Sequence, residues 1–188
     1  MTASDRFIDT TVTYLEMREQ PVRPTTPSPS SRAKLALLRA ENPTLSFYRY
    51  LYGTVGGSLN WTDRLILDDE TLLAIIQDPL VEVYVLYLGG VPAGFVELDR
   101  RQDGEIELTY LGLLPEFIGR GWGRYLLDWA IHTAWSHAPQ RLWLHTCDLD
   151  GPRALPLYQR AGFVAYDQRI EKVVATDALN TSPRAISD

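Results

Sequence analysis

Cysteine is scarce in this chain of 188 residues, in which Cys147 is the only one. A disulfide within the chain is therefore excluded, and no cysteine cluster is present to hold a metal ion. Long apolar runs are also missing, because no stretch approaches the roughly 18 residues that a membrane-spanning helix needs. The first residues show no basic segment followed by an apolar one, as a secretory signal would. We therefore expect a cytoplasmic protein that works without a membrane and without a metal.

Positive charge is in short supply as well. Lys and Arg number 18 against 24 Asp and Glu, which gives a formal net charge of −6. Because surfaces that bind nucleic acid are usually basic, this balance argues against a nucleic-acid partner. Hydrophobic residues make up 45% of the chain and charged residues 22%. These proportions and this length are typical of a globular protein with one core of its own.

Two polar segments stand apart from the patterned part of the chain. Residues 20–31 contain four prolines. They predict an extended linker, because proline lacks a backbone donor and disfavours helix. Residues 176–188 are polar and show no apolar period, which predicts a flexible tail. We therefore predict one domain over residues 1–175. The linker could be a mobile lid or could reach a second subunit of a homodimer, and the sequence leaves both open.

Alternation and turn signals predict a sheet with helices around it. Runs of β-branched and aromatic residues predict strands, and Gly89-Gly90 predicts a hairpin between two of them. Apolar residues spaced three and four apart predict helices, the clearest of which begins near Gly121. The expected strands cover residues 10–15, 81–88, 91–98, 105–114, 142–145, 163–166 and 169–175, and the expected helices 32–40, 45–52, 69–77, 121–137 and 151–160. The fold class is α/β of the α+β type, with a mixed, mostly antiparallel sheet flanked by helices.

A glycine-spaced loop joins one predicted strand directly to the clearest helix. Gly119, Gly121 and Gly123 allow backbone N–H groups to converge on an anion, and the helix N-terminus adds donors and a positive dipole end. Arg120 and Arg124 add charge, so the loop predicts a phosphate or pyrophosphate site. A nucleotide-hydrolysing phosphate loop is disfavoured, because the Lys and Ser or Thr that it requires are missing. The dinucleotide fingerprint also fails, since its last glycine is replaced by Arg124.

Residues 111–123 resemble the acetyl-CoA loop of the GNAT superfamily of N-acetyltransferases, whose pattern is Gln/Arg-x-x-Gly-x-Gly/Ala. Gly121 and Gly123 match its two small positions, whereas Ile118 stands at its first position and departs from it. The resemblance implies that backbone N–H groups of this segment bind the pyrophosphate of acetyl-CoA. The cofactor-binding residues that it implies are Leu111, Gly112, Leu113, Ile118, Gly119, Arg120, Gly121, Trp122, Gly123 and Arg124.

A second block agrees with this resemblance. Residues 154–163 are similar to the family's later segment, with Ala154, Tyr158 and the Gly-Phe pair at 162–163 in matching positions. Gly151 replaces the usual Asn. The resemblance implies the GNAT fold and direct transfer of an acetyl group from acetyl-CoA to a primary amine. In that reaction Tyr158 would be the acid that protonates the departing thiolate.

The acceptor amine needs a base, because an alkylammonium has a pKa near 10 and must lose a proton before it attacks. Strand alternation places Glu105, Glu107 and Thr109 on one face and Ile106, Leu108 and Tyr110 on the other. In family members that use a glutamate on this strand, the base stands eleven residues before the first position of the loop pattern, which is Ile118 here, and this identifies Glu107. Glu107 is our first choice, directly or through a water, and a merely solvated glutamate is the alternative reading of it.

Two other side chains could supply the base, and one backbone group is implied as the oxyanion donor. Glu97 on the neighbouring strand is the second choice, and His145 is the third, since histidine titrates nearest neutrality. The family's oxyanion donor is a main-chain N–H that corresponds to Leu111. Gly112 beside it would permit a bulge that frees this donor.

The acceptor site is predicted between the early helices and the central strands. Aromatic faces combined with carboxylates attract cations. We therefore expect Tyr48, Tyr52, Glu97 and His145 to contact the acceptor, which favours a small cationic metabolite. A Cys147–His145 nucleophile lacks support elsewhere in the sequence. The acidic residues near His145 are more typical of a capped loop than of a metal site.

Two functions remain open at this point. The first is an N-acetyltransferase that uses acetyl-CoA and acts on a small cationic amine or on a peptide N-terminus. The second is a catalytically silent module that binds acyl-CoA for sensing or for a structural purpose. Changes at Glu107 and Tyr158 would distinguish them, because only an enzyme has turnover to lose.

Overall fold

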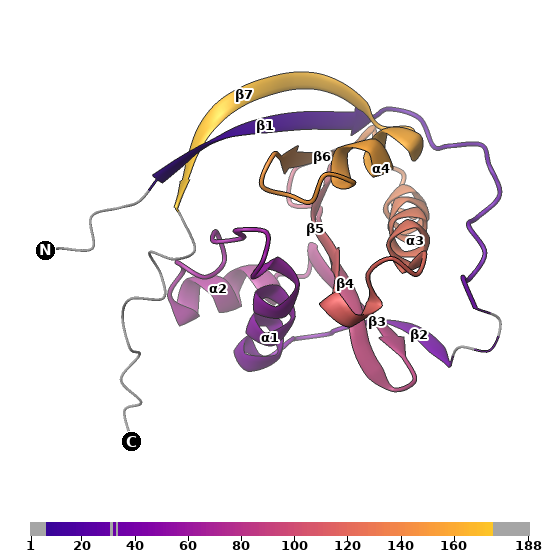
Figure 1. The fold of residues 1–188 in the computed structure, drawn as a ribbon, viewed down its shortest axis with the longest axis horizontal. Coiled ribbons are helices and arrows are strands. Elements are labelled where there is room, and N and C mark those ends of the chain that lie inside the picture. Colours follow the sequence, from indigo (N-terminus) through magenta and orange to yellow (C-terminus); the bar gives the residue numbers. More distant parts are fainter. Residues whose placement is uncertain (1–6, 31, 33, 175–188) are drawn as a thin grey trace, which may run out of the picture.

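The fold is built on one seven-stranded sheet. A computed structural model describes residues 7–30, 32 and 34–174. The strands lie in the order β2-β3-β4-β5-β6-β1-β7, and every neighbouring pair is antiparallel except β5 and β6, which are parallel (Figure 1). The strand bounds are β1 Phe7–Met17, β2 Leu35–Arg39, β3 Val81–Leu88, β4 Val91–Asp99, β5 Glu105–Leu113, β6 Arg141–Cys147 and β7 Val164–Val174. The predicted fold class, a mixed and mostly antiparallel sheet with helices, is confirmed.

Helices cover both faces of this sheet. Their bounds are α1 Leu45–Gly56, α2 Asp69–Ile76, α3 Trp122–Ser136 and α4 Ala154–Arg160. α1 and α2 share one hydrophobic core with Val83, Val85 and Phe95 of the sheet. α3 and α4 share a second core with Val96 and Leu98. These two residues lie on β4, on the opposite face of the strand from Phe95. In Figure 1 the two helix pairs accordingly lie on either side of the central strands.

Local sequence signals set the helix ends. Asp68 caps α2, since its Oδ1 accepts a hydrogen bond from the Thr71 N–H at 2.8 Å. The helix predicted over residues 45–52 was expected to end there, and this is wrong, because α1 continues to Gly56. Gly53 faces open space, and its carbonyl accepts a bond from the N–H of Gly57 at 3.0 Å. The helix therefore passes through this glycine and ends one turn later.

Two further predictions of secondary structure are corrected. Residues 32–40 were predicted as a helix, but they contain the edge strand β2, which pairs with β3. Leu35 and Leu37, which are two residues apart as on one face of a strand, both pack against the core. Sheet pairing therefore outweighs the helical propensity of this leucine-rich run. The strands predicted at 163–166 and 169–175 form the single strand β7, whose register with β1 shifts between Tyr14 and Leu15. Residue 175 and the predicted tail at 176–188 lie outside the described residues.

The N-terminal strand is inserted between β6 and β7, so residues from the two ends of the described chain pair with each other. Residues 18–30, here called the strap, leave the end of β1 and run past α3 towards β2 at the opposite edge (Figure 1). The strap contains no helix or strand. It nevertheless touches α3, because Asp128 accepts hydrogen bonds from Arg23 and from the N–H of Thr26.

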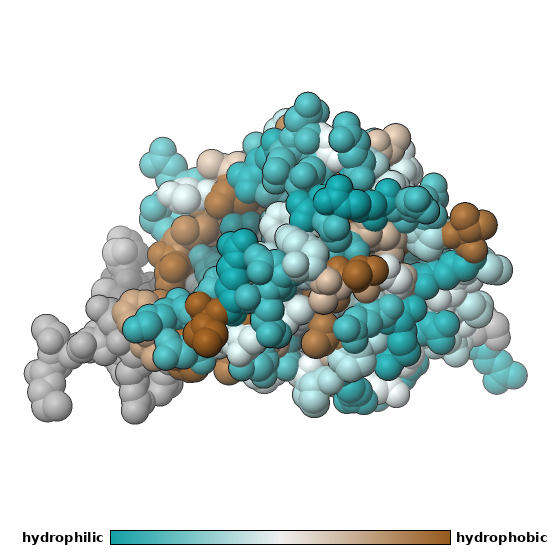
Figure 2. All heavy atoms as spheres, turned by 90° about the horizontal axis from the view of Figure 1, so that it is seen from above, coloured by the Kyte–Doolittle hydropathy of each residue, from teal (hydrophilic) through white to brown (hydrophobic). Residues whose placement is uncertain are grey.

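The face above β1 and β7 is mainly hydrophilic. Figure 2, which looks down on these strands, shows apolar side chains scattered among polar ones and not gathered into one broad patch. Val164, Tyr166 and Ile170 of β7 are among the exposed large hydrophobic residues. The homodimer therefore stays a prediction. No helix among the described residues is long and apolar enough to cross a membrane.

Candidate active site

A cleft opens where two central strands separate. β5 and β6 pair only over residues 105–107 and 141–143, and beyond these residues they diverge. The cleft, about 200 Å³ in volume, is lined by residues 108–111 of β5 on one side and by His145 and Cys147 of β6 on the other. Tyr158 of α4 and the loop that follows α1 complete its walls. The parting of parallel strands thus provides a slot in the middle of the sheet.

A bulge in β5 shapes one wall of this cleft. Glu97 pairs with Tyr110 and Leu98 with Leu108, so Thr109 is the extra residue. The bulge turns Tyr110 to the opposite face from Leu108, which corrects the simple alternation predicted for this strand. It also leaves the Thr109 hydroxyl buried at the cleft wall without a hydrogen-bond partner among the described residues. A ligand in the cleft would find this hydroxyl unoccupied.

The bulge predicted at Gly112 is therefore in the wrong place, and Gly112 has another reason to be glycine. A Cβ at this position would lie 2.2 Å from Val55 Cγ1, far inside contact distance. Gly112 thus permits α1 to approach β5 closely. This approach places the loop that follows α1 over the cleft, where Trp61 and Asp63 line it.

The glycine-spaced loop has the shape that anion binding requires. Gly119 and Gly121 have φ values of 82° and 85°, a left-handed conformation that favours glycine. Gly121 is the N-cap of α3 and provides no side-chain bond, so the first N–H groups of the helix stay open to a ligand. Arg120 and Arg124 make no ion pair with any described carboxylate. Ile118, also predicted to bind the cofactor, is 53% exposed and offers only its backbone for polar contact.

Glu107 and His145 form a pair at the base of the cleft. Glu107 Oε1 lies 3.2 Å from His145 Nδ1. His145 lines the cleft, whereas Glu107 lines a separate hollow beside Trp143. The hydrogen bond that His145 donates to the Glu107 carboxylate raises the pKa of His145 above its ordinary value, against the opposing effect of burial. The structure therefore brings two of the three base candidates together, and the histidine is the one that faces the cleft.

Tyr158 stands at the opposite wall. Its side chain comes from α4, is 9% exposed and lines the cleft. Burial, with a smaller contribution from the charge of Asp150, raises its pKa well above the ordinary value for tyrosine. The phenol therefore keeps its proton at neutral pH, as a general acid must. Leu111, the predicted oxyanion donor, lies on the β5 wall of the same cleft.

Three predicted acceptor contacts lie elsewhere. Glu97 is fully buried, and its two oxygens accept hydrogen bonds from Arg64 at 2.7 Å and from the Tyr48 hydroxyl at 2.5 Å. Tyr48 and Tyr52 are 0% and 1% exposed and belong to the core under α1. None of the three lines the cleft. Their aromatic pattern belongs to the core, and Glu97 neutralises a buried arginine, which removes it as a base candidate.

The cleft is lined instead by acidic residues that the sequence pattern did not single out. Asp63 from the loop after α1 and Glu171 from β7 line the cleft together with Asp150. Asn60 fixes this loop to β7, since its Nδ2 donates to the Val174 carbonyl at 2.9 Å. The cleft is lined by no lysine or arginine among the described residues. No local signal marked Asp63 or Glu171, because their proximity arises only when the loop meets a strand more than 100 residues away.

The Cys147 and Asp150 region has a structural explanation. Asp150 Oδ2 accepts bonds from the Thr146 hydroxyl at 2.6 Å and from the N–H of Cys147 at 3.0 Å, as a loop-capping residue does. Burial raises the pKa of the Cys147 thiol, so little thiolate forms at neutral pH. Among the described residues no group of three or more potential metal ligands is found.

Comparison with known proteins agrees with these features. Residues 39–163 match the model of the acetyltransferase (GNAT) family. No curated protein matches this chain. A GCN5-related N-acetyltransferase from Sphaerobacter thermophilus has a TM-score of 0.61 at 13% identity, covering 90% of this chain and 53% of its own. The chain thus spans about half the length of that relative.

Two further structures are similar in fold. An aminoglycoside acetyltransferase from an uncultured soil metagenomic sample has a TM-score of 0.58 at 16% identity, covering 73% of this chain and 93% of its own. An acetyltransferase from Bacillus subtilis, in complex with CoA, has a TM-score of 0.52 at 21% identity, covering 70% and 77%. The family match extends over more than half of the residues and includes both the glycine-spaced loop and Tyr158. This chain therefore belongs to the acetyltransferase (GNAT) family.

Proposed function

We propose that this protein is an N-acetyltransferase that transfers the acetyl group of acetyl-CoA to the primary amine of a small cationic metabolite. The observation that supports this most is the cleft between β5 and β6. Its lining includes a candidate base, His145, a candidate acid, Tyr158, and three carboxylates. The glycine-spaced loop lies at the end of β5, where the open N–H groups of α3 suit a pyrophosphate.

The residues of the cleft divide the chemistry between them. His145 takes a proton from the acceptor ammonium, and Glu107 holds the imidazole and stabilises the charge that it gains. The amine nitrogen then attacks the thioester carbonyl, whose developing oxyanion is stabilised by the Leu111 N–H. The carbon–sulfur bond breaks, Tyr158 donates its proton to the departing thiolate, and the phenolate so formed takes the second proton from the nitrogen. Acetyl-CoA and amine thus become CoA and amide, with no covalent enzyme intermediate.

The charge of the cleft lining supports a cationic acceptor. Asp63, Asp150 and Glu171 line the cleft, and no basic residue of the described chain lines it. The Glu171 carboxylate accepts a hydrogen bond from the Tyr14 hydroxyl at 2.6 Å, and this bond together with burial raises the pKa of that phenol to about 12. Trp61 and Tyr110 add aromatic surface, on which an alkylammonium can rest.

A panel of acceptors tests this proposal. Release of free thiol from acetyl-CoA is followed with small diamines and polyamines, and with neutral and acidic amines of similar size. We expect turnover with the cationic compounds, and mass spectrometry should find the acetylated amine in equal amount to the thiol. Asp63→Asn should raise KM for the best amine by about tenfold with a smaller change in kcat, because the carboxylate attracts the charge and does no chemistry.

The matched control is Asp103→Asn, which removes a carboxylate from an exposed turn away from the cleft. Its KM should equal that of the wild type. Preferential turnover of acidic amines, or an unchanged KM in Asp63→Asn, would contradict the cationic acceptor while leaving the acetyltransferase activity in place.

A further inference from the structure

The strap is outside the family match, which begins at residue 39, and the active site described above makes no use of it. Its middle is nevertheless tied to α3. Arg23 Nη2 donates to Asp128 Oδ1 at 2.8 Å, and the N–H of Thr26 donates to Asp128 Oδ2 at 2.6 Å. Asp128 is only 3% exposed, although its position in the helix pattern is on the polar side. The strap thus satisfies a buried carboxylate and is held beside the helix.

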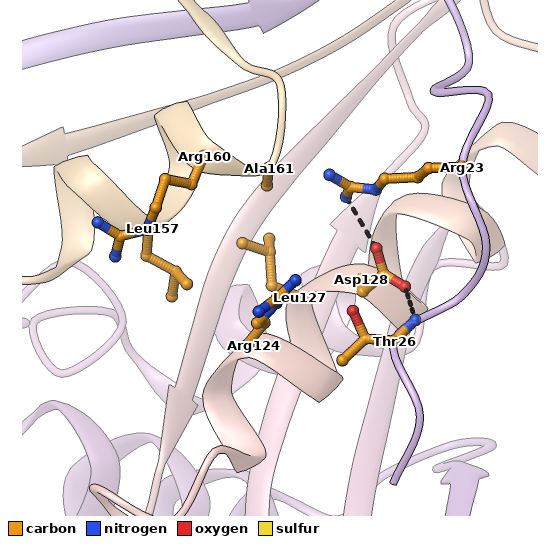
Figure 3. A pocket seen from close by; sticks show the side chains of 8 residues that line it. All are labelled: Arg23, Thr26, Arg124, Leu127, Asp128, Leu157, Arg160 and Ala161. Atoms are coloured by element: carbon orange, nitrogen blue, oxygen red, sulfur yellow. Dashed lines mark hydrogen bonds and ion pairs between the residues drawn. The ribbon is translucent and has the colours of Figure 1, made fainter. Parts of the chain in front are cut away.

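A pocket of about 490 Å³ lies between the strap, α3 and α4. Arginines from all three segments line it, namely Arg23, Arg124 and Arg160. In Figure 3 the guanidinium groups of Arg23 and Arg124 border the space between the strap and α3, while that of Arg160 is turned away from both along α4. The pocket therefore has two guanidinium groups beside it and a third arginine among its lining residues.

The charges of the pocket do not balance internally. Three arginines face one carboxylate, Asp128, which leaves a net charge of about +2 in a chain whose total is −6. Arg124 and Arg160 make no ion pair with any described carboxylate. A phosphate monoester carries close to −2 at neutral pH, and guanidinium groups bind phosphate in a two-pronged geometry. The excess charge of this pocket therefore matches one phosphate group.

The position of the pocket, next to the expected pyrophosphate site, indicates which phosphate group of the ligand it would bind. Arg124 belongs to the first turn of α3, so the pocket begins beside the expected pyrophosphate site and reaches Asp128 one turn, about 5.4 Å, further along. The strap also spans this distance, since Pro29 Cγ is 3.4 Å from where a Cβ on Gly121 would lie. In CoA the pyrophosphate and the 3′-phosphate are carried by the same ribose. A pyrophosphate at the glycine-spaced loop therefore brings the 3′-phosphate to within reach of this pocket.

We propose that the strap completes the acetyl-CoA site, with Arg23 and Arg124 binding the 3′-phosphate and Arg160 adding to the positive field around it. This inference rests on the proposed function, because it requires CoA at the glycine-spaced loop. Asp128 and Thr26 are positioning residues, which hold Arg23 in place. The strap thereby selects CoA over 3′-dephospho-CoA, a choice that a loop binding only the pyrophosphate cannot make.

Calorimetric titration of the full chain with CoA and with 3′-dephospho-CoA tests this inference. The wild type should bind CoA at least about tenfold more tightly, as charge-assisted bonds to a phosphate imply. Arg23→Gln should lower this preference towards one by weakening CoA alone, and Arg23→Lys should restore part of it. Arg124→Gln should act in the same direction while leaving the bonds between the strap and Asp128 intact. Arg18→Gln is the control, since Arg18 belongs to the strap but pairs with Glu16.

Each outcome decides one of the two claims. Equal affinity of the wild type for both compounds, or an unchanged preference in both Arg23→Gln and Arg124→Gln, would overturn the inference and leave the proposed function standing. Failure of the wild type to bind either compound would overturn both.

Discussion

Replacing His145 with glutamine is expected to lower kcat for amine acetylation by about 10²- to 10⁴-fold, the usual contribution of a positioned base. His145 lines the cleft and is held by Glu107 at 3.2 Å. Glutamine keeps the size and polarity of the side chain but cannot accept the proton. Steady-state thiol release checks the rate, and calorimetry should show that acetyl-CoA binds as tightly as to the wild type. A similar loss of acetyl-CoA affinity would indicate that the substitution disturbs the cleft and not the proton transfer.

The pH profile separates the two partners of this pair. Only a neutral imidazole accepts a proton, so wild-type activity should rise with pH through the pKa of His145. Glu107 raises this pKa above the ordinary value of 6.5. Glu107→Gln removes the raising interaction and leaves burial, which lowers the pKa, so the midpoint of the profile should move to lower pH. Glu105→Gln is the control, because Glu105 lies on the same strand but pairs with Arg141.

The opposite pattern would reassign the base. If Glu107→Gln abolished activity at every pH while His145→Gln retained it, Glu107 would be the base itself, acting directly or through a water. That outcome would restore the first choice of the sequence analysis and would make His145 the residue that positions it.

Tyr158→Phe is expected to lower kcat by about 10²-fold or more, because the departing thiolate loses its proton donor. The pKa of Tyr158 is raised by burial, so the wild-type phenol stays protonated across the working pH range. Phenylalanine preserves the packing of the ring against Phe163, whose centroid is 6.3 Å away. Thermal stability and acetyl-CoA affinity should therefore remain near those of the wild type.

Thiol release measured beside Tyr87→Phe checks this expectation. Tyr87 is partly buried on β3, packs against the core under α1 and takes no part in the cleft. Its variant should keep full activity. Unchanged turnover in Tyr158→Phe would remove Tyr158 as the acid. A wild type that binds acetyl-CoA but turns over no amine would instead support the silent acyl-CoA-binding module.

Much of the fold could be predicted because its signals are local. The Gly89-Gly90 turn between two apolar runs predicted the β3–β4 hairpin, and the apolar spacing after Gly121 predicted α3. The helix predicted over residues 32–40 was wrong, because a leucine-rich run fits either a helix or an edge strand. Its pairing with β3 decides between the two. The insertion of β1 between β6 and β7 could not be predicted, because it depends on pairing between the two ends of the chain.

In the candidate site, too, the features encoded by local sequence could be predicted, and those that depend on distant parts of the chain could not. The glycine-spaced loop is a continuous motif, and its left-handed glycines could be predicted from residue type alone. The bulge at Thr109 could not, because an extra residue in β5 is visible only against the register of β4. The same holds for Asp63 and Glu171, which meet only in the folded chain. The prediction that Tyr48 and Tyr52 contact the acceptor was wrong, because an aromatic stripe on a helix is typical of a core face as well as of a binding face.

The most direct test of the central claim is thermal unfolding with and without acetyl-CoA. Ligand at about 100 times its dissociation constant adds roughly 2.7 kcal/mol to the stability of the folded state. For a chain of this size the melting temperature should then rise by about 5 to 11 °C. A rise of this order is the predicted result. No shift at millimolar acetyl-CoA would contradict the claim that the cleft and the glycine-spaced loop bind this substrate.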